Sequence, residues 1–309
     1  MPINNTESNQ AATADDHPLL QPLDIGGLTI ENRLMVAPMA GVTDNPFRRL
    51  CKSFGAGHAV SEMIIADTAL YARKKSLYRA NFDNEIAPIS AQIAGAEPDK
   101  LAEAARYQID NGAQIIDINM GCPAKKVCRR LAGSALLQDE DLVARLLDAA
   151  VGAVDAPVTL KTRLGFENGR ENILRVAKRA EQAGIAAIAI HGRTREDMYS
   201  GEARYELIRE VKESISIPVI ANGDIEHFLR SGEVLAAPSV SEIKEIVLAH
   251  LQELYEFYGE YSGCRIARKH IAWYTTGIPN SNAFRQAMYG EESTAGQFRV
   301  VEDFLHAHE

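Results

Sequence analysis

The residues best placed to do chemistry stand at the ends of short apolar runs in this 309-residue chain. The run 115–118 leads into Asn119, Gly121 and Cys122, and α/β folds carry their chemistry on loops of this kind beyond a strand. Cysteine is often only a small buried apolar residue. A thiol in a Gly-Cys-Pro turn after a strand is more typical of a functional group, so Cys122 is the first candidate catalytic residue.

Polar side chains follow the other apolar runs in the same way. A single glutamine or lysine at a strand end is more often a structural hydrogen-bonding group than a functional one. The strand ends of a barrel meet at one rim, so the polar side chains at these ends lie close together. Several such side chains at one rim favour a functional site over a structural function. The candidates are Pro38, Met39, Ala40, Gln92, Lys161, Arg163, His191, Asn222, Gly223 and Asp224.

Short apolar runs alternate with helical stretches between residues 34 and 222. Strands are expected at 34–39, 59–63, 88–93, 115–119, 158–161, 187–191 and 218–222, and helices at 45–54, 98–111, 139–151, 170–183 and 202–212. This alternation predicts a parallel sheet covered on both faces. No G-x-G-x-x-G motif follows the first strand, so an α/β TIM-type (β/α)8 barrel is favoured over a Rossmann sheet.

Other segments complete the predicted organisation. Residues 1–17 are polar and predict a disordered tail. Apolar and polar residues alternate in 23–30 on both sides of Gly26-Gly27. This pattern predicts a β-hairpin that plugs the bottom of the barrel. Helical patterns at 241–254, 265–274, 283–289 and 294–307 predict a small all-α domain. The expected domains are therefore a tail at 1–17, a barrel at 18–237 and a helical domain at 238–309.

Composition bounds the class of protein. No apolar run approaches the length of a membrane span and no signal-peptide pattern is present, which predicts a cytoplasmic protein. The four cysteines have neither CxxC pairing nor metal-ligand spacing, so reduced thiols and no metal are expected. The net charge of -9 argues against a nucleic-acid binder judged as a whole, although recognition can rest on a local patch.

Several motifs together resemble the dihydrouridine synthases. They are Ala37-Pro38-Met39-Ala40-Gly41-Val42-Thr43-Asp44, Gln92-Ile93-Ala94-Gly95, Asn119-Met120-Gly121-Cys122-Pro123, Leu160-Lys161-Thr162-Arg163, His191-Gly192-Arg193-Thr194-Arg195 and Asn222-Gly223-Asp224-Ile225. In the helical domain, Arg265-Ile266-Ala267-Arg268-Lys269-His270 resembles the bacterial B-type subfamily. The resemblance runs from about Leu23 to near the C-terminus.

The resemblance implies an FMN-containing barrel and a helical domain that binds tRNA. Such an enzyme reduces the 5,6 double bond of selected uridines in tRNA, and NADPH supplies the electrons to the flavin. Hydride passes to C6 of the base, and Cys122 would protonate C5 as a general acid. The uridine must leave its stack to reach a flavin at the mouth of a barrel.

The same resemblance assigns further residues to cofactor and substrate. Pro38, Met39 and Ala40 would lie against the flavin ring, and Gln92 and Lys161 would bond its polar edge, where a lysine stabilises the anionic reduced flavin. The other implied cofactor residues are His191, Asn222, Gly223 and Asp224, and the implied substrate residues are Asn119, Lys125, Lys126, Arg163, Arg265, Arg268 and Lys269.

The basic substrate residues form two clusters. Lys125 and Lys126 follow the catalytic loop, whereas Arg265, Arg268 and Lys269 share one expected helix. Clusters of this kind either neutralise phosphates of a nucleic acid or are simply solvated basic faces, and the sequence leaves both interpretations open.

The sequence departs from the family pattern after Ile225. The family barrel continues there with a helix, an eighth strand and a Gly-Arg loop that holds the FMN phosphate. In this chain roughly 30 residues, the length of one βα unit, are absent. An incomplete barrel is therefore expected, with residues 234–237 as a possible substitute strand that carries no phosphate donors.

Three hypotheses follow. The first is an FMN- and NADPH-dependent tRNA-dihydrouridine synthase of the B type. The second is a catalytically inactive, internally deleted homologue that retains at most tRNA binding. The third is a different FMN-dependent barrel oxidoreductase that acts on small molecules.

Overall fold

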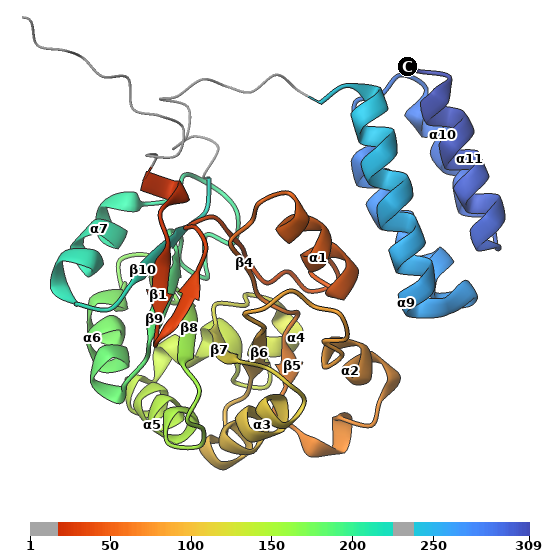
Figure 1. Ribbon diagram of the computed structural model, residues 1–309. Coiled ribbons are helices and arrows are strands. Elements are labelled where there is room, and N and C mark those ends of the chain that lie inside the picture. The colour runs from red at the N-terminus through yellow and green to blue at the C-terminus, as the bar shows by residue number, and fades with distance from the viewer. Residues whose placement is uncertain (1–17, 225–237) are drawn as a thin grey trace, which may run out of the picture. The chain divides into compact units, whose positions relative to one another are not determined.

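The computed structural model describes residues 18–224 and 238–309 (Figure 1). Contacts along the chain divide these residues into two compact units, one on each side of the undescribed residues 225–237. The expected tail at 1–17, the departure from the family pattern after Ile225 and the expected substitute strand at 234–237 lie outside the described residues.

Parallel strands form the wall of a barrel in the first unit. β3 (Met35–Val36) pairs with β4 (His58–Ala59), and a bridge between Val60 and Ser90 leads on to the next strands. A six-stranded sheet follows in the order β5-β6-β7-β8-β9-β10. Its strands are β5 (Ile64–Ile65), β6 (Ser90–Ala94), β7 (Ile115–Met120), β8 (Val158–Arg163), β9 (Ala187–His191) and β10 (Val219–Asn222).

All seven strands expected from the sequence have a counterpart. The second, expected at 59–63, is replaced by two short strands, β4, which overlaps the expected range only at Ala59, and β5, which begins just beyond it. In the part of the chain that the structure describes, β3 and β10 are the two outer strands and neither has a second partner. The seven-stranded wall is therefore open between β3 and β10 within residues 18–224, as the apparent loss of the eighth βα unit leads one to expect.

Helices cover the outside of this wall (Figure 1). The expected helices are confirmed as α1 (Asn45–Ser53), α3 (Pro98–Asp110), α5 (Glu140–Val151), α6 (Ile173–Ala183) and α7 (Tyr205–Ser214). The carboxylates of Asp44 and Asp139 cap α1 and α5 by accepting bonds from the backbone N–H groups of Phe47 and Leu142. Gly184, with a φ of 91°, ends α6 in the left-handed conformation.

Several short helices were not expected. They are η2 (Pro18–Leu20), η3 (Thr68–Leu70), α2 (Lys74–Arg79), α4 (Lys125–Cys128) and η4 (Gly133–Gln138). None is long enough to show a full amphipathic repeat, which is the signal that sequence analysis uses.

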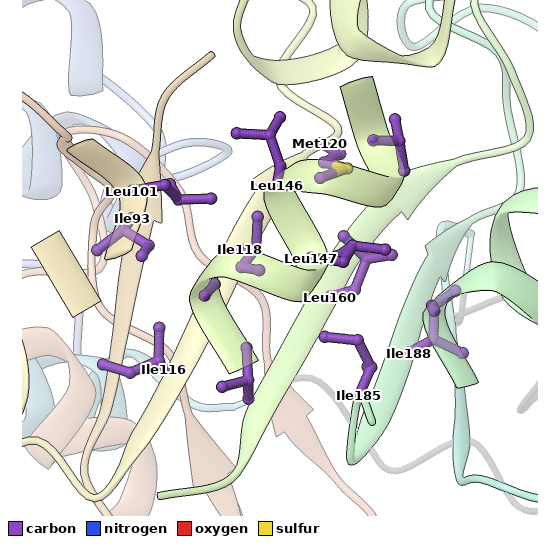
Figure 2. Close-up of a cluster of buried hydrophobic side chains, with 14 of the residues drawn as sticks. Ile93, Leu101, Ile116, Ile118, Met120, Leu146, Leu147, Leu160, Ile185 and Ile188 are labelled. Carbon is purple, nitrogen blue, oxygen red and sulfur yellow. The ribbon is translucent and has the colours of Figure 1, made fainter. Parts of the chain in front are cut away.

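The core lies between the strands and the covering helices (Figure 2). Successive side chains of a strand point to opposite faces, so Ile116, Ile118 and Leu160 pack outward against Leu146 and Leu147 of α5. The intervening residues of the same strands point into the barrel. This alternation places the polar members of otherwise apolar strands at its centre and rim.

A hairpin closes the opposite end of the barrel. β1 (Leu23–Ile25) pairs antiparallel with β2 (Leu28–Ile30) across Gly26-Gly27. The buried Ile25 and Ile30 pack with Ile115 and Ala187, the first residues of β7 and β9. The predicted hairpin is therefore confirmed, together with its place at the N-terminal ends of the strands.

The second unit is entirely helical in its described residues. It consists of α9 (Val240–Tyr274), α10 (Ser281–Gly290) and α11 (Thr294–His306). Ser239 and Glu242 form a capping box at the start of α9, and Gly259 interrupts that helix with a φ of 73° and a ψ of 173°. No helix of the described residues is long and apolar enough to cross a membrane.

Two histidines are buried next to each other in this unit. The rings of His250 and His270 lie 4.9 Å apart, edge to face, and each residue is only 1% exposed. Burial lowers the pKa of His250 to about 4 and that of His270 to about 3, with a smaller contribution from the Lys269 cation. Both rings are therefore neutral in the folded protein above pH 4.

We expect the free energy of unfolding of the helical unit to fall as the pH drops from 6.5 towards 4. Between these pH values the two histidines are protonated in the unfolded chain and neutral in the folded chain. The free energy of unfolding therefore falls by up to about 1.4 kcal/mol per pH unit for each histidine. Amide hydrogen exchange of α9 and α11 in the full chain, measured at pH 7 and pH 5, reports this loss. His270→Phe should reduce it, whereas His306→Phe at an exposed position of α11 should not. An equal loss in both variants would contradict the assignment.

Candidate active site

A cavity of about 590 Å³ opens at the C-terminal ends of the strands. The structure brings together there ten of the residues selected from the sequence. They are Pro38, Met39, Ala40, Gln92, Asn119, Cys122, Lys161, Arg163, His191 and Asn222. These residues lie within or just after β3, β6, β7, β8, β9 and β10, so six different strands contribute to one rim.

A chain of hydrogen bonds joins the cavity residues Gln92 and Asn119 to Asp117 and Thr159. The buried Asp117 carboxylate accepts bonds from Thr159 Oγ1 at 2.6 Å and from Gln92 Nε2 at 2.7 Å. Gln92 Oε1 in turn accepts a bond from Asn119 Nδ2 at 2.8 Å. The parallel register makes these contacts possible, because it sets Asp117 beside both Gln92 and Thr159 on the neighbouring strands. Burial raises the pKa of the Asp117 carboxyl, against the opposing effect of its two hydrogen bonds.

The chain of bonds ends at the loop that carries the thiol. Asn119 Oδ1 accepts bonds from the backbone N–H groups of Gly121 at 3.2 Å and Cys122 at 2.9 Å. The carbonyl oxygen of Cys122 is held from the other side by the hydroxyl of Ser134 at 2.9 Å. The backbone of Cys122 is therefore fixed on both sides, while its side chain lines the cavity.

Cys122 is half-buried in this loop. Burial raises the pKa of its thiol, against the opposing effects of a hydrogen bond from the Ala124 backbone and of the nearby Arg163. The side chain is therefore a protonated thiol at neutral pH, as a proton donor must be.

Lys161 is a half-buried cation of the site. Its Nζ donates a hydrogen bond to Asn222 Oδ1 at 2.8 Å, which links β8 to β10. Burial lowers the pKa of its amine to about 8, while the nearby Asp117 acts in the opposite direction. The amine therefore remains largely protonated at neutral pH and faces the cavity beside Gln92.

Arg163 has a structural function that the sequence did not predict. Its Nε donates to the carbonyl of Gly121 at 2.8 Å, and Nη1 donates to the carbonyls of Thr194 at 2.9 Å and Met198 at 2.7 Å. The guanidinium also lies 5.5 Å from the ring centre of Tyr199. Arg163 thus ties the thiol loop to the loop after β9, and its expected contact with substrate remains a prediction.

The remaining predicted cofactor residues lie beside this rim. Asp224 forms an ion pair with Arg193 at 2.6 Å and accepts a bond from the backbone N–H of Ala203 at 2.8 Å. These bonds lower the pKa of the Asp224 carboxyl. Gly223 has a φ of 105°, and a Cβ there would stand 3.0 Å from the His191 ring, so glycine allows the close approach. Burial and neighbouring cations keep His191 neutral by lowering its pKa to about 3.

Three residues that line the cavity, and one that anchors its hydrogen bonds, were missed or given no function by sequence analysis. Met63, Met198 and Tyr199 line the cavity, and Asp117 anchors its hydrogen-bond chain. A carboxylate inside the apolar run 115–118 was a signal for Asp117. The other three lie in loops, where no periodicity indicates which side chain turns towards a site.

The predicted basic clusters fall in different units. Lys125 and Lys126 are exposed on α4, directly after the thiol loop. In the helical unit, the Arg265 guanidinium lies 3.7 Å from the ring centre of Tyr261, and Arg268 donates to the carbonyl of Glu291 at 2.9 Å. Lys269 is half-buried. Contact of these residues with a nucleic acid stays a prediction.

Comparison with solved structures relates the fold to two enzymes. Histamine dehydrogenase from Rhizobium sp. 4-9 matches with a TM-score of 0.51 and 15% identity, over 84% of this chain and 51% of that one. A 2-naphthoyl-CoA reductase matches with a TM-score of 0.52 and 14% identity, over 69% of this chain and 48% of that one. Likeness at this level of identity concerns the fold alone.

Comparison with curated proteins gives far closer matches. Proteins named tRNA-dihydrouridine synthase B are 50% identical in Pseudomonas aeruginosa, over 91% of this chain and 95% of that protein, and 46% identical in Vibrio cholerae, over 92% and 98%. The alignment with the P. aeruginosa protein spans 315 positions, yet it includes only 91% of 309 residues, which is about 281. About 34 of its positions therefore have no counterpart in this chain.

The model of the dihydrouridine synthase family matches residues 35–236 and 226–309. The two matches overlap at residues 226–236, close to the expected shortening after Ile225. Together they include residues 35–309, and with them every residue that lines the cavity. This chain therefore belongs to the dihydrouridine synthase family.

Proposed function

We propose that this chain is a tRNA-dihydrouridine synthase, which reduces the 5,6 double bond of selected uridines in tRNA with FMN as its cofactor and NADPH as the electron donor. The observation that carries the proposal is the single cavity that holds both the Cys122 thiol and the Lys161 ammonium. The names of the close relatives support tRNA as the substrate, and a substrate of this kind supports a cytoplasmic location.

The cavity residues fit FMN. The buried Lys161 amine has three N–H groups and donates one bond to Asn222, while the Gln92 amide donates one to Asp117. Their remaining N–H groups suit the carbonyl-rich edge of a flavin, and the apolar Pro38 and Met39 suit its ring. A volume of about 590 Å³ also lies in the usual range for cofactor sites.

The chemistry divides between cofactor and protein. Bound FMN supplies the hydride that adds to C6 of the uracil. The Cys122 thiol donates its proton to C5, which completes the saturated bond and leaves a thiolate that regains a proton from solvent. The Lys161 ammonium supplies positive charge at the cavity wall where negative charge accumulates on the reduced cofactor. The Asn119 amide holds the backbone of Cys122 in position for this transfer.

The two other hypotheses are less well supported. An inactive remnant is not favoured, because the rim residues from six strands still line one cavity with an intact hydrogen-bond chain. An oxidoreductase for small molecules is not favoured either, because the matching relatives cover nearly the whole chain and are named for tRNA.

The proposal is tested by purifying the full chain and recording its visible spectrum. We expect flavin absorbance, bleaching by NADPH faster than by NADH, and dihydrouridine formation in an unmodified tRNA transcript. A colourless protein that takes up no added FMN and forms no dihydrouridine would refute the proposal.

A glycine beneath the thiol loop provides a geometric test. Gly133 has a φ of 65°, and a Cβ there would lie 2.7 Å from the carbonyl oxygen of Cys122. We expect Gly133→Ala to displace the thiol and reduce dihydrouridine formation by about tenfold to a hundredfold, since a shift of about 1 Å can cost that much. Gly169→Ala is the matched control, because Gly169 also has a positive φ of 75° but nothing lies within 4 Å of its Cβ position. Equal activities of the two variants at equal stability would contradict the displacement.

A further inference from the structure

A second hollow in the barrel unit is lined by cations. It has a volume of about 290 Å³ and lies between α2 and its preceding loop on one side and α4 on the other. Its five basic residues are Arg73, Lys75, Arg79, Lys126 and Arg130, and its lining includes no carboxylate. We call it the α2–α4 groove.

The charge of this groove is largely uncompensated. Arg79 pairs with Glu62 at 2.9 Å and donates to the carbonyl of Met63, so its guanidinium is fixed within the wall. Among the described residues, no carboxylate forms an ion pair with Arg73, Lys75, Lys126 or Arg130, and these four residues are exposed. Four exposed cations gathered on a chain of net charge -9 indicate a local affinity for a polyanion.

The groove leads directly from the active site. Met63 lines both hollows, and Lys126 stands only four residues after Cys122. The floor of the groove is apolar, with Ile64 and Leu70 among its residues. A single RNA strand carries regularly spaced phosphates, which cationic walls can neutralise, and exposes the faces of its bases, which can pack on an apolar floor.

We propose that the α2–α4 groove binds the phosphodiester backbone of the nucleotides next to the reacting uridine. The proposal rests on the proposed function, because the uridine enters the cavity that shares Met63 with the groove. It assigns Arg73 and Lys75 on the α2 side to the RNA, neither of which the motifs indicated. The exposed cations contact phosphates, whereas Arg79 keeps the wall in place.

The salt dependence of RNA binding tests the groove. The dissociation constant of the full chain for an unmodified tRNA transcript is measured by fluorescence anisotropy over a range of salt concentrations. Lys75→Ala/Arg130→Ala removes one cation from each wall. Each lost phosphate contact reduces the slope of log K against log salt by about 0.7 to 0.9, so we expect a decrease of about 1.4 to 1.8.

A matched control removes the same charge from the same two segments. Lys74→Ala/Arg129→Ala alters the preceding residue in each case, and neither side chain lines the groove. Lys74 lies instead over the ring of Tyr78. We expect this control to retain most of the wild-type slope. Equal decreases in both double variants, or an unchanged slope in the groove variant, would overturn the proposal.

Two further measurements separate this proposal from others. The groove variant should raise the KM for tRNA and leave the KM for NADPH unchanged; the opposite pattern would assign the groove to the phosphates of NADPH and overturn the proposal. Flavin content and dihydrouridine formation of the wild-type chain test the proposed function independently. The wild-type chain could bind RNA with a salt slope that the groove variant reduces, and yet form no dihydrouridine. That result would support RNA binding by the groove and contradict the proposed function.

Discussion

Cys122→Ala is expected to reduce dihydrouridine formation by about a hundredfold to ten-thousandfold, the usual contribution of a general acid. Burial raises the pKa of the thiol, so wild-type Cys122 holds its proton at neutral pH and can release it to the base. The loop of the variant should remain in place, because Asn119 and Ser134 hold the backbone of residue 122 rather than its side chain. Flavin absorbance should therefore be unchanged.

The matched control is Cys128→Ala. Cys128 is also half-buried, and its sulfur lies 3.7 Å from the carbonyl oxygen of Cys122, but it does not line the cavity. We expect this variant to keep most of the activity and the wild-type flavin content. Quantifying dihydrouridine in tRNA by mass spectrometry distinguishes the two variants. Comparable activity in both would show that the thiol of Cys122 is not the proton donor.

Lys161→Met is expected to weaken flavin binding by about tenfold to a hundredfold, which corresponds to a charge-assisted hydrogen bond of about 1.5–3 kcal/mol. The amine is the cation that faces the cavity beside Gln92, and its loss also leaves the buried Asp117 without its neighbouring positive charge. Titration of the apoprotein with FMN measures the affinity. Lys212→Met, at an exposed position on α7, is the control and should bind FMN as the wild type does.

The pH dependence of flavin binding gives this prediction a second measurement. The pKa of Lys161 is lowered to about 8, so the amine is cationic below that pH and loses its charge above it. Wild-type affinity for FMN should therefore fall as the pH rises through about 8 to 9, and this fall should be absent in Lys161→Met. The linked effect on folding has the opposite sign. Between pH 8 and 10.5 the unfolded chain binds the additional proton, so this group makes the free energy of unfolding rise with pH. A flat binding profile in the wild type would contradict the assignment.

Much of the scaffold was predictable because its signals are local. The seven strands and five covering helices of the barrel unit each carry a hydrophobic period within their own residues. The hairpin at Gly26-Gly27 and the capping serine of α9 are likewise encoded in a few neighbouring residues. The short helices α2 and α4 were missed because a helix of one or two turns shows no such period. Both helices form walls of the cationic groove.

The sequence by itself determined the family, the thiol loop and the set of polar residues that stand at strand ends. Only the tertiary structure decided what these residues do to one another. It linked Gln92 to Asp117, Lys161 to Asn222 and Arg163 to the carbonyl of Gly121, over separations of 25, 61 and 42 residues. Those contacts depend on strand register and on loop paths, which are fixed when the whole sheet packs against its helices rather than by any local pattern. The same packing joins the active cavity and the cationic groove through Met63, although nothing in the sequence near that residue indicated it.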